Sequence, residues 1–168
     1  MNKRTDVKLY NVLFPLWILI WLPSYLWLLL IPLNYALDHF VTWYTIKDLP
    51  DAKQFCWKNA WNICIVGFAC DFIGSALLLG ITELTYNIEG SIFEKIGDGL
   101  TFNPFNNPTS FIICLIAVAF SGFLIYIIDR KILYKANLSL ERATRSAKWL
   151  ALITAPYLFM IPSGFLYK

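Results

Sequence analysis

Residues 61–84 read WNICIVGFACDFIGSALLLGITEL. Their only charged side chains are Asp71 and, close to the end, Glu83. A bilayer core about 30 Å thick is crossed by about 20 predominantly apolar residues in one helix, so this stretch predicts a transmembrane helix. Two further stretches of similar length and apolarity, residues 110–128 and 148–167, are predicted to be transmembrane helices for the same reason.

The composition of the whole chain agrees with this setting. Of 168 residues, 58% are apolar and 15% are charged, and the mean hydropathy is +0.58. An ordinary soluble domain is about 45–50% apolar, so folding in water would leave too few polar side chains to cover this surface. Soluble enzymes, disordered chains and coiled coils are therefore excluded. We expect an all-α integral membrane protein with a single transmembrane domain, residues 1–168, whose first partner is the lipid bilayer.

The distribution of charge predicts the orientation. The net charge of +3 does not come from one basic face, so nucleic acid is not an expected partner. Residues 129–147 contain five Lys and Arg side chains, whereas residues 86–108 contain Lys95 alone among three acidic residues. Cytoplasmic loops carry the excess of Lys and Arg. Residues 129–147 are therefore predicted to be a basic cytoplasmic connection, residues 86–108 an outer loop, and the C-terminus to lie outside.

The N-terminal apolar region, residues 10–46, allows two interpretations. It is too long for one upright span and short for two spans with a turn, and Pro15, Pro23 and Pro32 interrupt it. Lys and Arg residues lie on both of its flanks, which favours a segment that enters and returns on the cytoplasmic side. We therefore predict a Pro-broken re-entrant or hairpin segment packed against three full transmembrane helices. The alternative is a bundle of four plain transmembrane helices with an external N-terminus.

Local signals predict shorter elements between the spans. Apolar residues at helical spacing in the outer loop predict a short interfacial amphipathic helix. Gly97, Gly99 and the two Asn-Pro pairs after them are turn signals, expected to end this helix. A helix is also expected over residues 137–148, leading into the last span, where Pro156 and Pro162 predict a kink.

Asp71 is the most informative residue of the sequence. An ionised carboxylate near the centre of a span costs roughly 2.5–3.5 kcal/mol, so it should face protein or stay protonated. Helical spacing places small residues on the same stripe, which is typical of a face packed on another helix. We interpret Asp71 either as a proton- or cation-binding carboxylate or as a structural hydrogen-bond partner. The residues of this stripe are Cys64, Gly67, Asp71, Gly74 and Ser75, and those of a matching stripe that is a candidate to dock on it are Cys114, Ala117 and Ser121.

Asn34 and Asp38 form a second candidate cluster for ion binding. They are four residues apart, so a helix presents them together, and they would line a cavity if the segment is re-entrant. The alternative is a helix end that reaches the interface. Asp129 and Glu83 sit at span ends and are interpreted as solvated carboxylates. One histidine and four cysteines without a C-x-x-C pair indicate no metal site, and we expect no cofactor.

The motifs of the common enzyme classes are absent, including H-E-x-x-H, the P-loop, G-x-S-x-G and the dinucleotide-binding glycines. The first hypothesis for function is accordingly a non-enzymatic accessory or structural subunit, which associates with itself or with a larger membrane complex through small-residue helix faces. The alternative is a transport or channel component that uses Asp71, with Asn34 and Asp38, to bind a proton or cation.

Three runs of sequence carry a resemblance: VLFPLWILIWLPSYLWLLLIPLNYALD (12–38), CDFIGSALLLG (70–80) and APYLFMIPSG (155–164). They resemble a group of small, uncharacterised multi-spanning membrane proteins of Gram-positive bacteria. The resemblance implies a multi-pass protein of the bacterial cytoplasmic membrane and transfers no activity.

Overall fold

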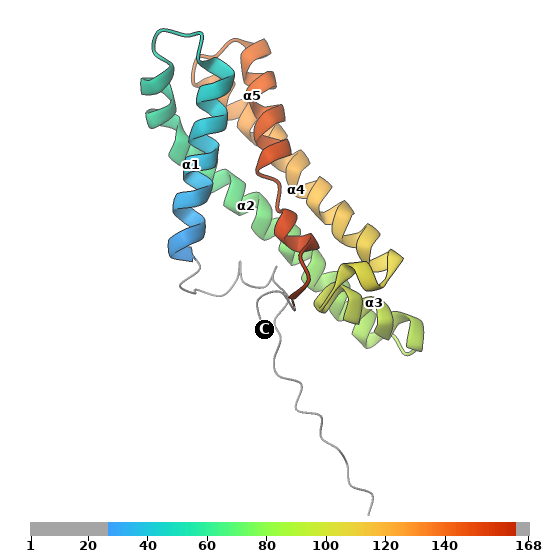
Figure 1. The fold of residues 1–168 in the computed structure, drawn as a ribbon. Coiled ribbons are helices and arrows are strands. Elements are labelled where there is room, and N and C mark those ends of the chain that lie inside the picture. The colour runs from blue at the N-terminus through green and yellow to red at the C-terminus, as the bar shows by residue number, and fades with distance from the viewer. Residues whose placement is uncertain (1–26, 164–168) are drawn as a thin grey trace, which may run out of the picture.

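The computed structural model describes residues 27–163, and this part of the chain is helical without a strand (Figure 1). Its long helices are α1 (Trp27–Ile46), α2 (Ala52–Asn87), α4 (Pro108–Lys135) and α5 (Leu140–Ile153). A shorter helix, α3 (Ser91–Thr101), and two 3-10 turns, η2 (Pro104–Asn106) and η3 (Tyr157–Met160), complete the fold. The all-helical prediction is therefore confirmed for the described residues.

Two of the helices are long and apolar enough to cross a membrane. They are α2 and α4, which contain the predicted stretches 61–84 and 110–128. With 36 and 28 residues, at 1.5 Å per residue, they extend roughly 54 and 42 Å. Both therefore exceed the thickness of a bilayer core of about 30 Å.

The two ends of the molecule differ in their balance of charge. The connections between α1 and α2 and between α4 and α5 lie together at one end, and α3 lies at the other (Figure 1). We call the first the basic end; its cationic residues are Lys47, Lys53, Lys131, Lys135, Arg142 and Arg145. We call the second the acidic end; its acidic residues are Glu89, Glu94 and Asp98.

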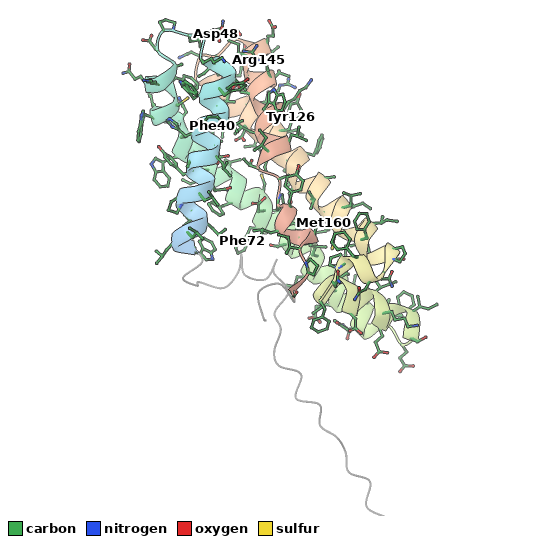
Figure 2. The ribbon with its side chains drawn as sticks, in the orientation of Figure 1. Phe40, Asp48, Phe72, Tyr126, Arg145 and Met160 are labelled. Atoms are coloured by element: carbon green, nitrogen blue, oxygen red, sulfur yellow. The ribbon has the colours of Figure 1, made fainter. Side chains whose placement is uncertain are left out.

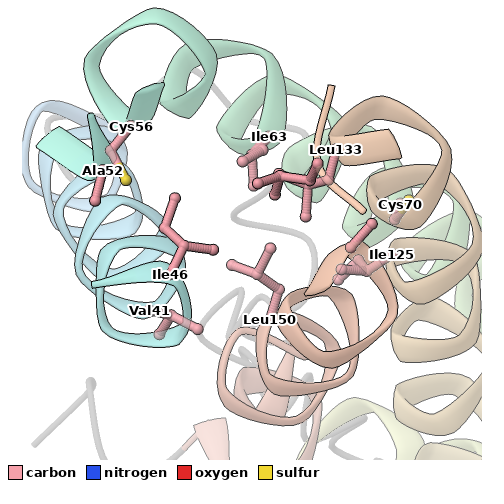
Figure 3. Packing of buried hydrophobic residues seen from close by; sticks show 11 residues of the cluster. Val41, Ile46, Ala52, Cys56, Ile63, Cys70, Ile125, Leu133 and Leu150 are labelled. Atoms are coloured by element: carbon pink, nitrogen blue, oxygen red, sulfur yellow. The ribbon is translucent and has the colours of Figure 1, made fainter. Parts of the chain in front are cut away.

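Two apolar clusters hold the helices together. At the basic end, Ile46, Ile63, Leu133 and Leu150 bring α1, α2, α4 and α5 around one core (Figure 3). At the acidic end, a second cluster joins α2, α3, α4 and η3; it contains Leu78, Leu100, Cys114, Ala117, Val118, Ala155 and Phe159. The long helices α2 and α4 contribute to both clusters, so they form the frame on which the shorter elements pack.

The surface of the helices is rich in large apolar side chains. Leu28 on α1 is 75% exposed, Ile65 on α2 is 61% exposed, and Phe123 on α4 is 58% exposed. Aspartates on the same three helices are buried. This distribution inverts the pattern of a protein that folds in water, in which charged side chains are almost never fully buried without a partner.

The end of the chain differs from the expected spanning helix over residues 148–167. The helix α5 begins earlier, at Leu140, where the Ser139 side chain accepts a hydrogen bond from the Arg142 N–H, and it ends at Ile153. Pro156 has no N–H with which to continue the helix, so the chain passes into η3 instead. Further on, the Ser163 hydroxyl donates to the Thr101 carbonyl at 2.9 Å. The described part of residues 148–167 therefore consists of the end of α5 and the turn η3, and it does not form one spanning helix.

The predicted outer loop, residues 86–108, contains the helix α3 and the turn η2. The predicted amphipathic helix is present as α3. The expectation that Gly97 and Gly99 end this helix is wrong, because both lie inside α3 and are buried. A methyl group at Gly99 would collide with the side chain of Ser110 on α4, so the glycine allows α3 to approach closely. The Asn-Pro pairs do mark the connections: Asn103 and Asn107 cap η2 and α4 with their side chains.

The N-terminal region is described only from Trp27 onward. Pro32 lies within α1 without ending it. Residues 10–26 lie outside the described residues. The structure therefore does not decide between a re-entrant segment and a plain crossing.

Candidate functional site: three buried aspartates

The stripe predicted on α2 faces other helices along its whole length. Cys64, Gly67, Asp71, Gly74 and Ser75 are all buried. At Gly74 a methyl group would collide with the Ser121 side chain of α4. The Ser121 hydroxyl also donates to the Cys70 carbonyl at 3.3 Å. The residues predicted for the matching stripe, Cys114, Ala117 and Ser121, are fully buried on α4.

The structure places Asn34 and Asp38 of α1 on the side that packs against α2. The Asn34 amide nitrogen lies 3.8 Å from the position of a Cβ built on Gly67. Asp38, one helical turn further, is only 2% exposed, and Asp71 lies one turn from Gly67 on the buried stripe of α2. The three residues proposed for ion binding therefore belong to one interface. His39 points to a neighbouring side, where it packs edge-on against Trp57 with ring centroids 5.3 Å apart.

Asp129 belongs to the same region, and its interpretation as a solvated residue at a span end is wrong. Its side chain is 1% exposed, because α4 continues to Lys135 and other helices cover this turn. It lies two helical turns along α4 from Ser121, whose hydroxyl contacts the carbonyl of Cys70, the residue next to Asp71. The spacing of the sequence contained the signal: Ser121, Ile125 and Asp129 follow one another at four-residue intervals along the buried side of α4.

We call Asp38, Asp71 and Asp129 the acidic cluster. Among residues 27–163, Arg142 and Asp48 form an ion pair at 2.7 Å. No ion pair of these residues includes an aspartate of the cluster. One carboxylate oxygen of Asp38, one of Asp71 and both of Asp129 are buried without a hydrogen-bond partner in this part of the chain. The cluster is therefore a region of buried acidic oxygens that lack a positive neighbour among the described side chains.

Further polar groups continue the region along α1 towards the basic end. Thr42 is fully buried, and its hydroxyl has no partner among the described residues. One turn later, the Thr45 and Ser146 hydroxyls form a hydrogen bond of 2.6 Å between α1 and α5. Arg145 donates to the Thr45 carbonyl at the end of α1. A line of hydroxyl groups thus leads from Asp38 to the cationic side chains at the basic end.

The chemistry of these groups favours the binding of a proton over that of a metal ion. No three His, Cys, Asp or Glu side chains of the described residues converge closely enough to hold a metal ion. The four cysteines are buried free thiols on α2 and α4. An isolated charge is costly to bury, whereas a carboxyl group that binds a proton becomes neutral and removes that cost.

Comparisons with known protein families, with curated proteins and with solved structures find no match. The resemblance to small membrane proteins of Gram-positive bacteria therefore stays a prediction, and the geometry of the acidic cluster carries the functional argument.

Proposed function

We propose that the protein is a small multi-pass protein of the bacterial cytoplasmic membrane. The support is the length and apolarity of α2 and α4 together with the large apolar side chains that every long helix exposes. In a bilayer these side chains contact lipid, while the aspartates and hydroxyl groups are kept inside the bundle. The cationic residues of the basic end would then face the cytoplasm, and α3 would lie at the outer surface.

Within this setting, we propose that the protein binds a proton or a monovalent cation through the acidic cluster, as a transport or channel component. The observation that carries the proposal is the burial of Asp38, Asp71 and Asp129, from three different helices, without a cationic partner among residues 27–163. Ionisable residues inside a membrane protein are expensive and usually mark ion or proton pathways. The cluster needs no cofactor and suggests no catalytic nucleophile, so we infer a non-enzymatic role.

The three aspartates come from three different helices, so the binding of a proton to one of them affects the contacts between these helices. Three buried carboxylates in one apolar bundle repel one another when they are charged, so a charge on any one of them disfavours charges on the others. A single proton or cation bound among the three therefore changes the electrostatic energy of all three helices. The hydroxyl groups of Thr42, Thr45 and Ser146 extend this polar region towards the basic end.

The proposal is tested by reconstituting the full chain in lipid vesicles with an entrapped pH-sensitive dye. A potassium diffusion potential drives proton entry, and separate vesicles with sodium- or potassium-sensitive dyes report the cations. We expect flux above that of protein-free vesicles, and its loss in Asp71→Asn. The matched control is Asp51→Asn, which removes an exposed carboxylate at the basic end. Flux equal to that of protein-free vesicles, or flux unchanged in Asp71→Asn, contradicts the proposal.

The second candidate is an accessory or structural subunit of a larger membrane complex or a homo-oligomer. The small residues first considered for association are used within the chain, where Gly67 faces α1 and Gly74 faces α4. A separate groove of about 590 Å³ between α4 and α5 has small side chains at Ala119, Gly122 and Ala151, which would allow the close approach of another helix. This candidate gains support if the vesicles show no flux while Gly122→Phe changes the mass of the particle in mild detergent.

A further inference from the structure

Two adjoining pockets between α1 and α5 share Tyr44, Thr45 and Trp149 and together form a groove whose lining changes along its length. Its lower section, about 190 Å³, is lined by Phe40, Val41, Tyr44, Thr45, Trp149 and Ile153. Its upper section, about 330 Å³, shares Tyr44, Thr45 and Trp149 with the lower one and adds Lys47, Asp48 and Arg145. Figure 2 shows Phe40 on α1 below Asp48 and Arg145, which lie at the basic end. The groove therefore runs from an apolar section to a charged one.

The charged section is positive as a whole. Asp48 is paired with Arg142 at 2.7 Å, so its charge is already compensated. Arg145 uses one of its N–H groups on the Thr45 carbonyl, and a guanidinium group has five. The Lys47 ammonium lies 4.5 Å from the centre of the Tyr44 ring, which holds it over the groove. Two cations thus remain available for an anionic group.

Aromatic residues mark the boundary between the two sections. Tyr44 and Trp149 line both, and they are 56% and 47% exposed. Tyr and Trp rings are favoured at the depth of lipid headgroups, where an apolar ring body meets a polar environment. Below this depth, Phe40 and Ile153 offer only apolar surface, which suits an acyl chain.

We propose that this groove binds one anionic phospholipid from the cytoplasmic leaflet. The phosphate lies between Lys47 and Arg145, and one acyl chain follows Trp149 towards Phe40 and Ile153. The order of the lining, cationic, then aromatic, then apolar, matches the order of chemical groups along such a lipid. The site rests on the proposed membrane placement, with the basic end in the cytoplasm. It contains none of the three aspartates of the acidic cluster, so it does not depend on proton movement.

The experiment uses the full chain in phosphatidylcholine vesicles that contain either brominated phosphatidylglycerol or brominated phosphatidylcholine. Bromine quenches tryptophan emission at contact, and the difference between the protein and Trp149→Phe isolates the emission of Trp149. We expect the anionic lipid to quench Trp149 in preference to the zwitterionic one. Trp61→Phe, which removes an exposed tryptophan of α2 outside the groove, should retain this preference.

Variants that remove charge test whether Lys47 and Arg145 cause the preference for the anionic lipid. An anionic headgroup near a membrane surface gains about five-fold in affinity for each Lys or Arg. Lys47→Gln should lower the preference about five-fold, and adding Arg145→Gln should lower it further. The matched control, Lys53→Gln with Lys58→Gln, removes two exposed cations of α2 near the same end. Because Arg145 also contacts Thr45, the single variant Lys47→Gln tests the site without disturbing that contact.

Any of three results overturns the proposal. The first is equal quenching of Trp149 by the two brominated lipids. The second is an equal loss of preference in the control and in the double variant Lys47→Gln with Arg145→Gln, which would show attraction to the charged surface as a whole. The third is removal of the preference by added inorganic phosphate, which would indicate a site for free phosphate and not for a lipid.

Discussion

At the scale of single residues, each of the three aspartates buries a carboxyl group without an ion-pair partner among the described residues. Each lies on the buried side of its helix, and each has at least one oxygen without a partner among the described residues. A buried unpaired charge is far more expensive than a buried neutral group. In an apolar bundle the neutral, protonated carboxyl group is therefore the form that we expect to dominate.

This expectation predicts reactivity with a hydrophobic carbodiimide, which activates protonated carboxyl groups in apolar surroundings. The full chain in detergent micelles should acquire adducts on the acidic cluster, and peptide mass spectrometry should locate them. Asp71→Asn should remove one adduct, whereas Asp51→Asn should leave the pattern unchanged. Labelling should fall as the pH rises and the carboxyl groups lose their protons. Labelling confined to exposed acidic residues would show that the cluster is charged or inaccessible.

At the scale of elements, the interface between α2 and α4 depends on the absence of a side chain at Gly74. Gly74→Ala would place a methyl group against the Ser121 side chain. Overpacking of this kind typically costs about 1–3 kcal/mol. We therefore expect a lower melting temperature in detergent and recovery in the double variant Gly74→Ala with Ser121→Gly.

Gly80→Ala is the matched control for this prediction. It lies on the same helix with open space around it. Alanine is favoured over glycine in a helix interior by roughly 0.5–1 kcal/mol, so this variant should melt at the same or a higher temperature. Equal destabilisation by the two alanines would attribute the effect to the helix itself and not to contact with α4.

The elements that could be predicted from the sequence are those with an uninterrupted apolar signal. Residues 61–84 and 110–128 lie within α2 and α4, and Asn103 and Asn107 act as caps in the connection between α3 and α4. The end of α5 could not be located in this way, because a proline that interrupts an apolar run can either kink a helix or end it; Pro156 predicts a kink, whereas the helix ends at Ile153. Gly97 and Gly99 were misread for the opposite reason: a glycine signals a turn only if no neighbouring helix requires the space.

The candidate site was predictable only in part. Helical spacing brought Asp71 and its small neighbours onto one face, and it brought Asn34 together with Asp38. The assembly of α1 against α2 and α4 depends on packing between segments far apart in the chain, which periodicity within one segment does not encode. Asp129 was missed because its neighbours Arg130 and Lys131 suggested the water boundary, although both of them are exposed on the same turn that buries the aspartate.

At the scale of the whole molecule, the two charged ends predict which positions share a side of the membrane. The buried native cysteines should react slowly with a membrane-impermeant maleimide, so introduced cysteines report accessibility. Lys53→Cys and Lys135→Cys, both at the basic end, should be labelled from one side. Glu94→Cys, on α3, should be labelled from the opposite side. Labelling of Glu94→Cys and Lys135→Cys from the same side would contradict the proposed crossing of α4.

The same reagent decides between the two predicted topologies of the N-terminal region. A re-entrant or hairpin segment keeps both of its flanks in the cytoplasm, so Asn2→Cys should react from the same side as Lys53→Cys. A plain fourth crossing places Asn2→Cys on the side of Glu94→Cys instead. The positive flank formed by Lys3, Arg4 and Lys8 favours the first result, because translocating three cations to the outer side opposes the rule that governs the other loops. Labelling of Asn2→Cys from the outer side would replace the re-entrant segment with four plain transmembrane helices.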